Sequence, residues 1–350
     1  MKDYRTQLDA LCFTAQQKQE MTDRLLAAAG TERPGRRSRR GVTAALIAAV
    51  LVLSVGTAGA TGALASAGAL LASWFGGAPA QVETLDRMGQ AVGATATADG
   101  VAVTVEAVVR DDRALALLCS VRRTDGQPLH DGPAGADDRL PLRFTTVQTD
   151  LPGVRDGYVE GTFRQGADGV VRYEETVLGT DAPLTGGTVR LTLTGLVSHH
   201  YAADGTTLVE EPIAAGPWTL TFPLDAASDA QRDLPAGQQM RVAGRDLVLD
   251  RVTISPLSLR VEGTVTVPEA DVSTRFEEAV AGLEGGLPLT VTFTDGTTLT
   301  ASGCARHGVE TVPAADDGAL TVREDWLFRS VRPLDEIASV TVGDVTIDLR

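Results

Sequence analysis

The chain has 350 residues, of which 31 are Lys or Arg and 46 are Asp or Glu, so its formal net charge is −15. An acidic balance of this size argues against a nucleic-acid binder, because attraction to phosphates dominates that kind of affinity. Three cysteines are too few for a fold held together by disulfides. The Cys and His spacings match no metal site, and we expect no cofactor.

Residues 1–40 form a basic arm that contains one predicted amphipathic helix, for which Thr14 starts a capping-box sequence. A segment of this length cannot build a core by itself. We expect Phe13, Met21 and Leu25 to anchor the helix in the groove of a partner. A merely solvated leader is an alternative of equal weight.

A charge-free gap follows the arm, because no charged residue lies between Arg40 and Glu83. Its apolar first part, residues 41–63, is long enough for one transmembrane helix. A cleaved signal peptide is the alternative, but 40 residues precede the apolar segment, more than such peptides have. We therefore predict an uncleaved anchor in the lipid of the cell membrane.

The orientation of this anchor follows from the basic residues in front of it, because positively charged flanks stay in the cytoplasm. These residues are Arg36, Arg37, Arg39 and Arg40. We expect a cytoplasmic N-terminus and an extracellular C-terminus.

The region beyond the membrane is predicted to be all-β. Residues 64–92 are expected to be a stalk, after which the hydrophobic period becomes two, as in Val101, Val103 and Val105. Asp-Gly turns separate such segments, and Asp295-Gly296 gives the clearest hairpin. The pattern predicts two tandem antiparallel β-sandwich (Ig-like) domains at residues 93–225 and 238–350.

The remaining predicted strands lie at residues 114–119, 140–147, 158–163, 170–177, 189–196, 218–224, 246–254, 257–267, 289–293, 297–302, 320–328 and 339–349. Helical patterns are scarce, and residues 274–283 give the best of them.

The two halves of this outer region resemble each other in sequence. The segment that starts at Val103 matches the segment that starts at Leu247, 144 residues later. Pro183-Leu184 matches Pro333-Leu334 at a slightly larger offset. Chance agreement between alternating strands would explain the apolar positions, but it explains the ordered Pro-Leu landmarks less well. We therefore predict that the second domain duplicates the first.

The outer region offers few groups for chemistry. Cys119 and Cys304 are the only pair that could form a disulfide outside the cell, although Cys119 lies in an apolar strand and is equally well explained as a buried thiol. His307 follows Cys304 at three residues, but sequence neighbours rarely form a nucleophile and its base. The segment that starts at His199 is expected to be an exposed loop. We expect no enzymatic activity.

The layout resembles the domain of unknown function 4179 family of single-pass proteins from Gram-positive bacteria. The segments that carry the resemblance are residues 11–18, the arginine cluster, the anchor, the strand entry at residues 99–101, residues 108–113 and residues 254–257. Members are taken to be anti-sigma-factor-like. The resemblance implies that the arm holds a cytoplasmic sigma factor while the outer region senses an envelope ligand or protein.

The same sequence features also fit a different function. The outer domains could form a surface-displayed module that binds cell-wall polymer, glycan or protein, with no transcriptional role. In that case the arm would only direct insertion into the membrane.

Overall fold

The computed structural model describes residues 65–349, apart from 203, 226–230, 243, 268–285 and 315–317. All of these residues belong to one compact unit, Ala48–Arg350. They form an all-β fold of several antiparallel sheets accompanied by short helices, which confirms the predicted class. The arm, the predicted anchor and the predicted helix at residues 274–283 lie outside the described residues. Within the described part of the chain, no helix is both long and apolar enough to cross a membrane.

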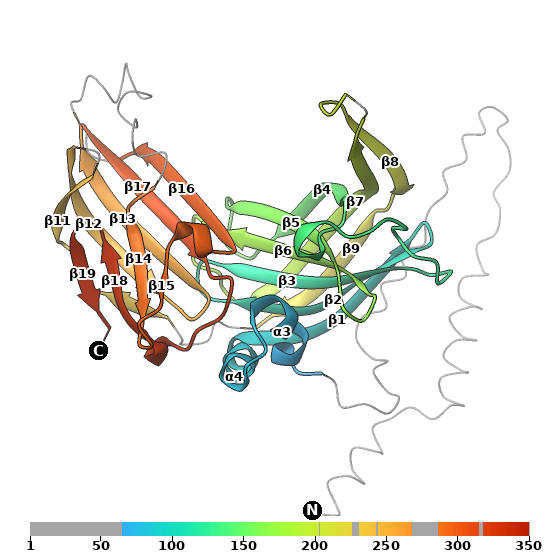
Figure 1. Ribbon diagram of the computed structural model, residues 1–350, viewed down its shortest axis with the longest axis horizontal. Helices are drawn as coiled ribbons and strands as arrows, with labels where there is room; N and C mark the ends of the chain where they lie inside the picture. The colour runs from blue at the N-terminus through green and yellow to red at the C-terminus, as the bar shows by residue number, and fades with distance from the viewer. Residues whose placement is uncertain are drawn as a thin grey trace, which may run out of the picture. The chain divides into compact units, whose positions relative to one another are not determined.

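The first nine strands make up the N-terminal β-region, residues 89–224 (Figure 1). One sheet has the order β1-β2-β3-β6-β5, and in the other β7 pairs with β4, β8 and β9. The strands are β1 (Gly89–Ala98), β2 (Val101–Arg110), β3 (Leu115–Arg123), β4 (Leu142–Asp150), β5 (Tyr158–Gln165), β6 (Val171–Leu178), β7 (Gly187–Tyr201), β8 (Leu208–Ala214) and β9 (Trp218–Leu224). The 3₁₀ turn Ala136–Asp138 precedes β4.

Both sheets of this region contribute to one hydrophobic core. At its centre Phe144 packs against Phe163, Tyr173 and Trp218, with ring centroids 5.0–5.6 Å apart. Trp218 is fully buried, and its indole N–H donates to the carbonyl of Val101 at 2.9 Å. The alternating apolar residues of the strands therefore bury one face of each sheet.

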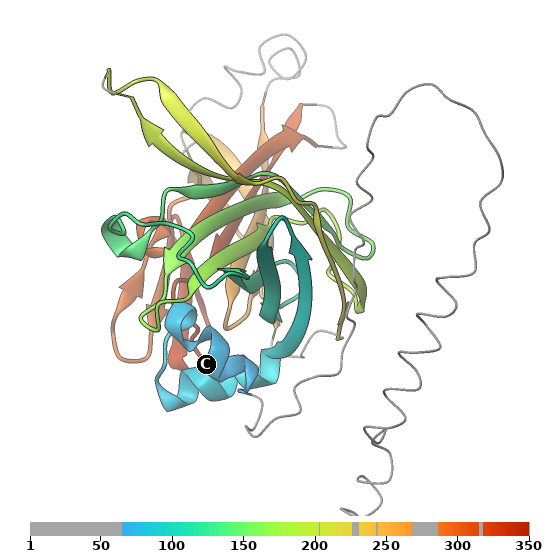
Figure 2. The same ribbon diagram turned by 90° about the vertical axis from the view of Figure 1, so that its right-hand side faces the viewer.

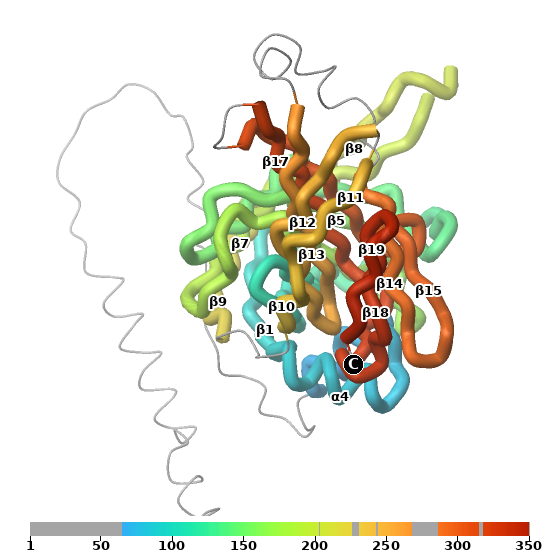
Figure 3. The backbone as a smooth tube through the Cα atoms, turned by 90° about the vertical axis from the view of Figure 1, so that its left-hand side faces the viewer, coloured from blue at the N-terminus to red at the C-terminus, as the bar shows by residue number. Residues whose placement is uncertain are grey.

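The C-terminal β-region, residues 232–348, has its own core and its own pair of sheets (Figure 3). One sheet has the order β10-β12-β13-β17-β16, with β11 also on β12, and the other has the order β15-β14-β18-β19. The strands are β10 (Arg232–Leu234), β11 (Gln239–Val242), β12 (Arg245–Ile254), β13 (Ser258–Thr266), β14 (Leu289–Phe293), β15 (Thr298–Leu299), β16 (Arg306–Pro313), β17 (Ala319–Leu327), β18 (Ile337–Val342) and β19 (Val345–Asp348).

The larger sheets of the two β-regions correspond in strand order and in register, whereas in the smaller sheets β8 pairs with β7 but β15 pairs with β14. Val103 pairs with Val121 in the first region, and Leu247 pairs with Val265 in the second, each residue 144 positions beyond its counterpart. The ladder is interrupted between Val105 and Ala107 in β2 and between Leu249 and Arg251 in β12, again 144 positions apart. A bulge at the same place in both hairpins is a specific feature that alternating sequence alone does not produce.

Two helices replace most of the expected stalk. In α3 (Ala67–Phe75), the hydroxyl of Ser66 caps the first turn by accepting from the Ala69 N–H at 3.2 Å. Gly76 ends α3 with φ +105, a conformation that favours glycine. The helix α4 (Pro79–Met88) starts with proline and runs directly into β1.

Both helices pack on the outer face of the first sheet (Figure 1). Their residues Leu71, Phe75 and Leu85 are fully buried in a third apolar cluster. That cluster also contains Leu118 of β3 and Leu327 of β17, so it joins the two β-regions. The segment at residues 64–92 was predicted as a stalk because it is uncharged up to Val82 and rich in glycine and alanine, but tertiary contacts fold it into the domain.

The segment that starts at His199 also differs from the sequence prediction. His199 and His200 were expected in an exposed loop, but they pair with Glu210 and Val209 as part of a β7–β8 hairpin. The hairpin projects from the rest of its region in Figure 2. The strand β8 was missed because its charged and proline-containing sequence does not alternate. The predicted hairpin at Asp295-Gly296 does form, between β14 and β15.

Candidate functional site

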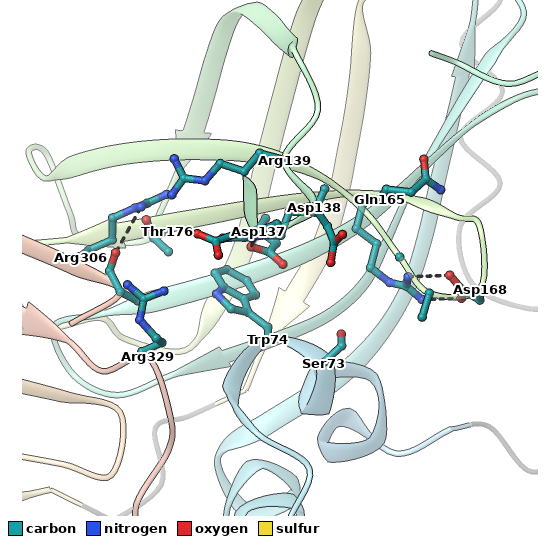
Figure 4. Close-up of a pocket in the computed structure, with 16 residues that line it drawn as sticks. Ser73, Trp74, Asp137, Asp138, Arg139, Gln165, Asp168, Thr176, Arg306 and Arg329 are labelled. Carbon is teal, nitrogen blue, oxygen red and sulfur yellow. Dashed lines mark hydrogen bonds and ion pairs between the residues drawn. The ribbon is translucent and has the colours of Figure 1, made fainter. Parts of the chain in front are cut away.

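A pocket of about 630 Å³ lies at the junction of α3 and the two β-regions (Figure 4). Ser73 and Trp74 line it from the end of α3, and strands β5 and β6 provide its sheet wall. Ala305, Arg306 and Arg329 line it from the C-terminal β-region. A volume of this size is typical of small-molecule sites.

Five arginines line the pocket, although the chain as a whole is acidic. Two of them are paired inside it. Arg172 donates to both carboxylate oxygens of Asp168 at 2.8 and 2.7 Å, and Arg164 Nε donates to Glu174 at 2.8 Å. Burial raises the pKa of Glu174, and the charge of Arg164 opposes that shift. These two pairs leave Arg139, Arg306 and Arg329 as the remaining cations.

The remaining arginines have few carboxylate partners. The side chain of Arg139 has no hydrogen bond or ion pair within the described residues, and Arg329 donates only to the carbonyl of Cys304 at 3.3 Å. Arg306 donates to the Thr162 hydroxyl at 3.0 Å and has an ion pair with Glu160, an exposed residue. Their guanidinium groups lie near one another at one end of the pocket in Figure 4.

The neighbouring positive charges affect the pKa of Arg306. Burial lowers the pKa of its guanidinium, while Glu160 acts in the opposite direction. The charges of Arg139 and Arg164 lower the same pKa further. An anion bound between Arg139 and Arg306 would relieve this repulsion.

Polar and aromatic groups complete the pocket. Asp137 and Asp138 both have positive φ, and their carboxylates accept no hydrogen bond from described residues. The backbone carbonyl of Asp137 accepts from Arg164. Trp74 stacks on Phe75 with ring centroids 4.7 Å apart and extends towards the two aspartates in Figure 4.

Buried acids form a second group of unusual residues. Glu175 is fully buried in the first core, and burial raises its pKa to about 7 while the Thr149 hydroxyl, which donates to it, opposes the shift. Glu324 is equally buried in the second region. It accepts from the N–H of Trp326 at 2.6 Å and lies 2.8 Å from His307 Nε2. Burial raises the pKa of Glu324 as well. Neither acid lines the arginine pocket.

The cysteines do not form a bridge. Both Cys119 and Cys304 are free thiols and buried, each in the core of its own β-region. Burial raises the pKa of Cys119, and it raises the pKa of Cys304 to about 12, so neither thiol is activated as a nucleophile. His307 is hydrogen-bonded to Glu324, whereas the Cys304 thiol points to the carbonyl of Thr300.

The other predicted site residues lie outside the described residues. They are Phe13, Met21 and Leu25 of the arm and the four arginines that precede the predicted anchor. No cluster of three or more metal-binding side chains occurs in the described part of the chain. Sequence reasoning missed the arginine pocket entirely, because its residues come from distant segments that belong to no motif.

Comparisons with known proteins add little. No family model and no curated protein matches the chain, so the resemblance to the domain of unknown function 4179 family stays a prediction. A similar solved structure is that of the conserved domain protein from Bacillus anthracis. It is 14% identical, with 72% of this chain and 75% of that chain covered and a TM-score of 0.45. This similarity is distant, and no functional conclusion follows from it.

Proposed function

We propose that this protein is a single-pass membrane regulatory protein, anti-sigma-factor-like, whose outer region binds an anionic ligand and whose cytoplasmic arm binds a transcription partner. The observation that carries the proposal is the arginine pocket. Guanidinium groups from both β-regions converge there, and two of them, those of Arg139 and Arg329, have no carboxylate partner among the described residues. A bound anion would hold both regions together through charge-assisted hydrogen bonds.

The place of α3 supports a sensing role for this pocket. The helix begins at Ala67, soon after the predicted anchor at residues 41–63, and its Trp74 lines the pocket. The carbonyl of Phe75 accepts from the Val331 N–H at 3.0 Å. In the next helix, Gln81 donates to the Ser330 hydroxyl at 2.6 Å. A ligand that touches Trp74 therefore acts on the element that leads to the membrane.

We also propose that the outer region consists of two tandem Ig-like β-sandwiches that arose by duplication and lie outside the membrane. Corresponding strand order in the larger sheets, equal register and a bulge at the same place in β2 and β12 support it. Under this proposal the pocket lies between two copies of one ancestral domain. Duplicated domains commonly create a new binding site where they meet.

On the cytoplasmic side, we propose that the arm binds the partner and sets the membrane orientation. Phe13, Met21 and Leu25 would anchor a sigma factor, and the arginines at 36, 37, 39 and 40 would set the orientation in the membrane. Ligand occupancy outside would then change how strongly the arm holds its partner. This part rests on the sequence pattern and on the family resemblance.

Two variants of the full-length protein test the proposal in cells. Replacing residues 1–33 with an unrelated basic leader removes the predicted helix of the arm, and R306Q together with R329Q removes two of the pocket cations. We expect the first variant to stop co-purifying with a sigma factor. Transcription that depends on this sigma factor should then increase. We expect the second variant to keep the sigma factor but to lose the response to envelope conditions. Unchanged sigma-dependent transcription in both variants would overturn the proposal.

The second candidate function is a surface-displayed module that binds cell-wall polymer, glycan or protein. The arginine pocket supports this function as well as it supports the regulatory one. A site of arginines and a tryptophan needs no cytoplasmic partner to bind an envelope anion. The leader replacement separates the two functions. A display module keeps its envelope binding and alters no transcription when residues 1–33 are exchanged.

A further inference from the structure

The arginine pocket combines groups for three kinds of contact. Arg139, Arg306 and Arg329 provide cationic donors at one end. Asp137 and Asp138 provide carboxylates, which are acceptor-only groups when ionised. Trp74 provides a flat apolar face between them.

We propose that the pocket binds a saccharide that carries a carboxylate or phosphate group. Guanidinium groups recognise either anion through paired N–H donors. Sugar hydroxyls are the donors that the unpartnered carboxylates of Asp137 and Asp138 require. The C–H face of a sugar ring packs well on an indole such as Trp74. This inference rests on the proposed function, because it names the ligand class of the same site.

The two aspartates discriminate against a bare anion. An inorganic anion placed among the arginines would also meet the negative charges of Asp137 and Asp138, and it would leave most of the roughly 630 Å³ unfilled. A neutral sugar would satisfy the aspartates and Trp74, but it would leave the guanidinium groups of Arg139 and Arg329 without an anionic partner among the described residues. Only a ligand with both an anionic group and hydroxyls satisfies all three kinds of contact.

The test is a titration of the full-length protein in lipid nanodiscs, read by calorimetry and by tryptophan fluorescence. Trp74 is the partly exposed tryptophan, whereas Trp218 and Trp326 are fully buried, so ligand-induced changes report on the pocket. The probes are trigalacturonate for the carboxylate, glucose 1-phosphate for the phosphate, maltotriose as the neutral sugar, and inorganic phosphate. We expect one or both charged saccharides to bind at least tenfold more tightly than maltotriose and inorganic phosphate.

Variants tie the binding to the pocket. We expect R329Q to weaken binding of the charged saccharide at least tenfold. The fold should tolerate this change because the Arg329 side chain is exposed and has no role in the core. D138N should weaken saccharide binding by a smaller factor than that by which it strengthens the binding of inorganic phosphate. R241Q alters an exposed ion pair in β11 and serves as the matched control, with binding unchanged.

Three outcomes would overturn the inference. They are binding of inorganic phosphate as tight as that of the charged saccharides, saccharide binding that R329Q leaves unchanged, and no binding of any probe. The first outcome leaves the proposed function intact, since an anion site would remain. The proposed function fails separately, by unchanged transcription in the cellular test.

Discussion

Asp111 accepts a hydrogen bond of 2.6 Å from Ser255, and the two residues are counterparts in the two β-regions, 144 positions apart. Each one closes its own hairpin turn in the same way. Asp111 accepts from the N–H groups of Arg113 and Ala114, whereas Ser255 Oγ accepts from those of Leu257 and Ser258. The two β-regions thus meet through equivalent turns, and the contact is almost fully buried.

The hydrogen bond between Ser258 and Asp111 provides the first prediction. The Ser258 hydroxyl donates to Asp111 Oδ2 at 2.5 Å in a buried site. Ser258→Ala should lower the free energy of unfolding by about 1.5–3 kcal/mol, because it removes a bond to a buried charged group. Urea denaturation measures the loss. The control is Thr297→Ala, which removes an exposed hydroxyl bond to Asp295 and should cost less than about 1 kcal/mol.

A buried ion pair gives the second prediction. Arg260 Nε donates to Asp325 at 2.6 Å, and the same guanidinium donates to the carbonyl of Thr180 in the other β-region. Arg260→Met should destabilise the protein by about 3–5 kcal/mol, because it leaves the carboxylate of Asp325 buried and unpaired. Adding Asp325→Leu should restore part of the loss. A double variant whose loss equals the sum of the single losses would contradict this account of the pair.

The third prediction concerns pH. The pKa of Glu175 is raised to about 7 in the folded protein, chiefly by burial, against a usual value of 4.5. The folded state therefore holds this proton while the unfolded state has released it, so the contribution of Glu175 to stability falls as the pH rises from about 4.5 to about 7. The Glu175→Gln variant has an amide at this position, which does not ionise in this pH range.

The measurement compares the urea midpoints of the parent protein and of Glu175→Gln at pH 5 and pH 8. The variant should gain stability relative to the parent by roughly 2–3 kcal/mol between these pH values. Glu210→Gln changes an exposed carboxylate paired with Arg143 and should show no such gain. A difference between parent and Glu175→Gln that is the same at both pH values would refute the assignment.

Thiol accessibility provides the fourth prediction. Cys119 and Cys304 are buried and free, so neither should react with a thiol reagent in the native protein and both should react in denaturant. Peptide mass spectrometry after labelling distinguishes the two positions. A peptide that links Cys119 to Cys304 in the non-reduced protein would contradict the structure.

The strands that the sequence predicted best are those with one buried face. In β9 the apolar residues Trp218, Leu220 and Phe222 alternate with exposed positions, and the predicted bounds match the strand. Strands β8 and β16 lie at sheet edges and bury few residues, so no hydrophobic period marks them. The helices α3 and α4 were missed because contacts with both β-regions, rather than local pattern, decide their fold.

The candidate site could not be predicted from the sequence. Arg139, Arg306 and Arg329 belong to no motif, and long segments of chain separate Arg139 from the other two. Arg306 lies in the pocket because β16 reaches β5, where it contacts Thr162 and Glu160. Trp74 lies in the pocket because it packs against the apolar cluster that joins the regions. Such convergence depends on how the two β-regions meet.

We expect a ligand in the arginine pocket to act on α3, the helix that follows the predicted anchor. Hydrogen exchange of α3 in the full-length protein, with and without a saturating charged saccharide, measures this effect. We predict that the amides of residues 71–75 exchange at least fivefold more slowly with ligand, and that R306Q with R329Q abolishes the effect at the same ligand concentration. Equal exchange in α3 with the pocket occupied and empty would contradict the claim.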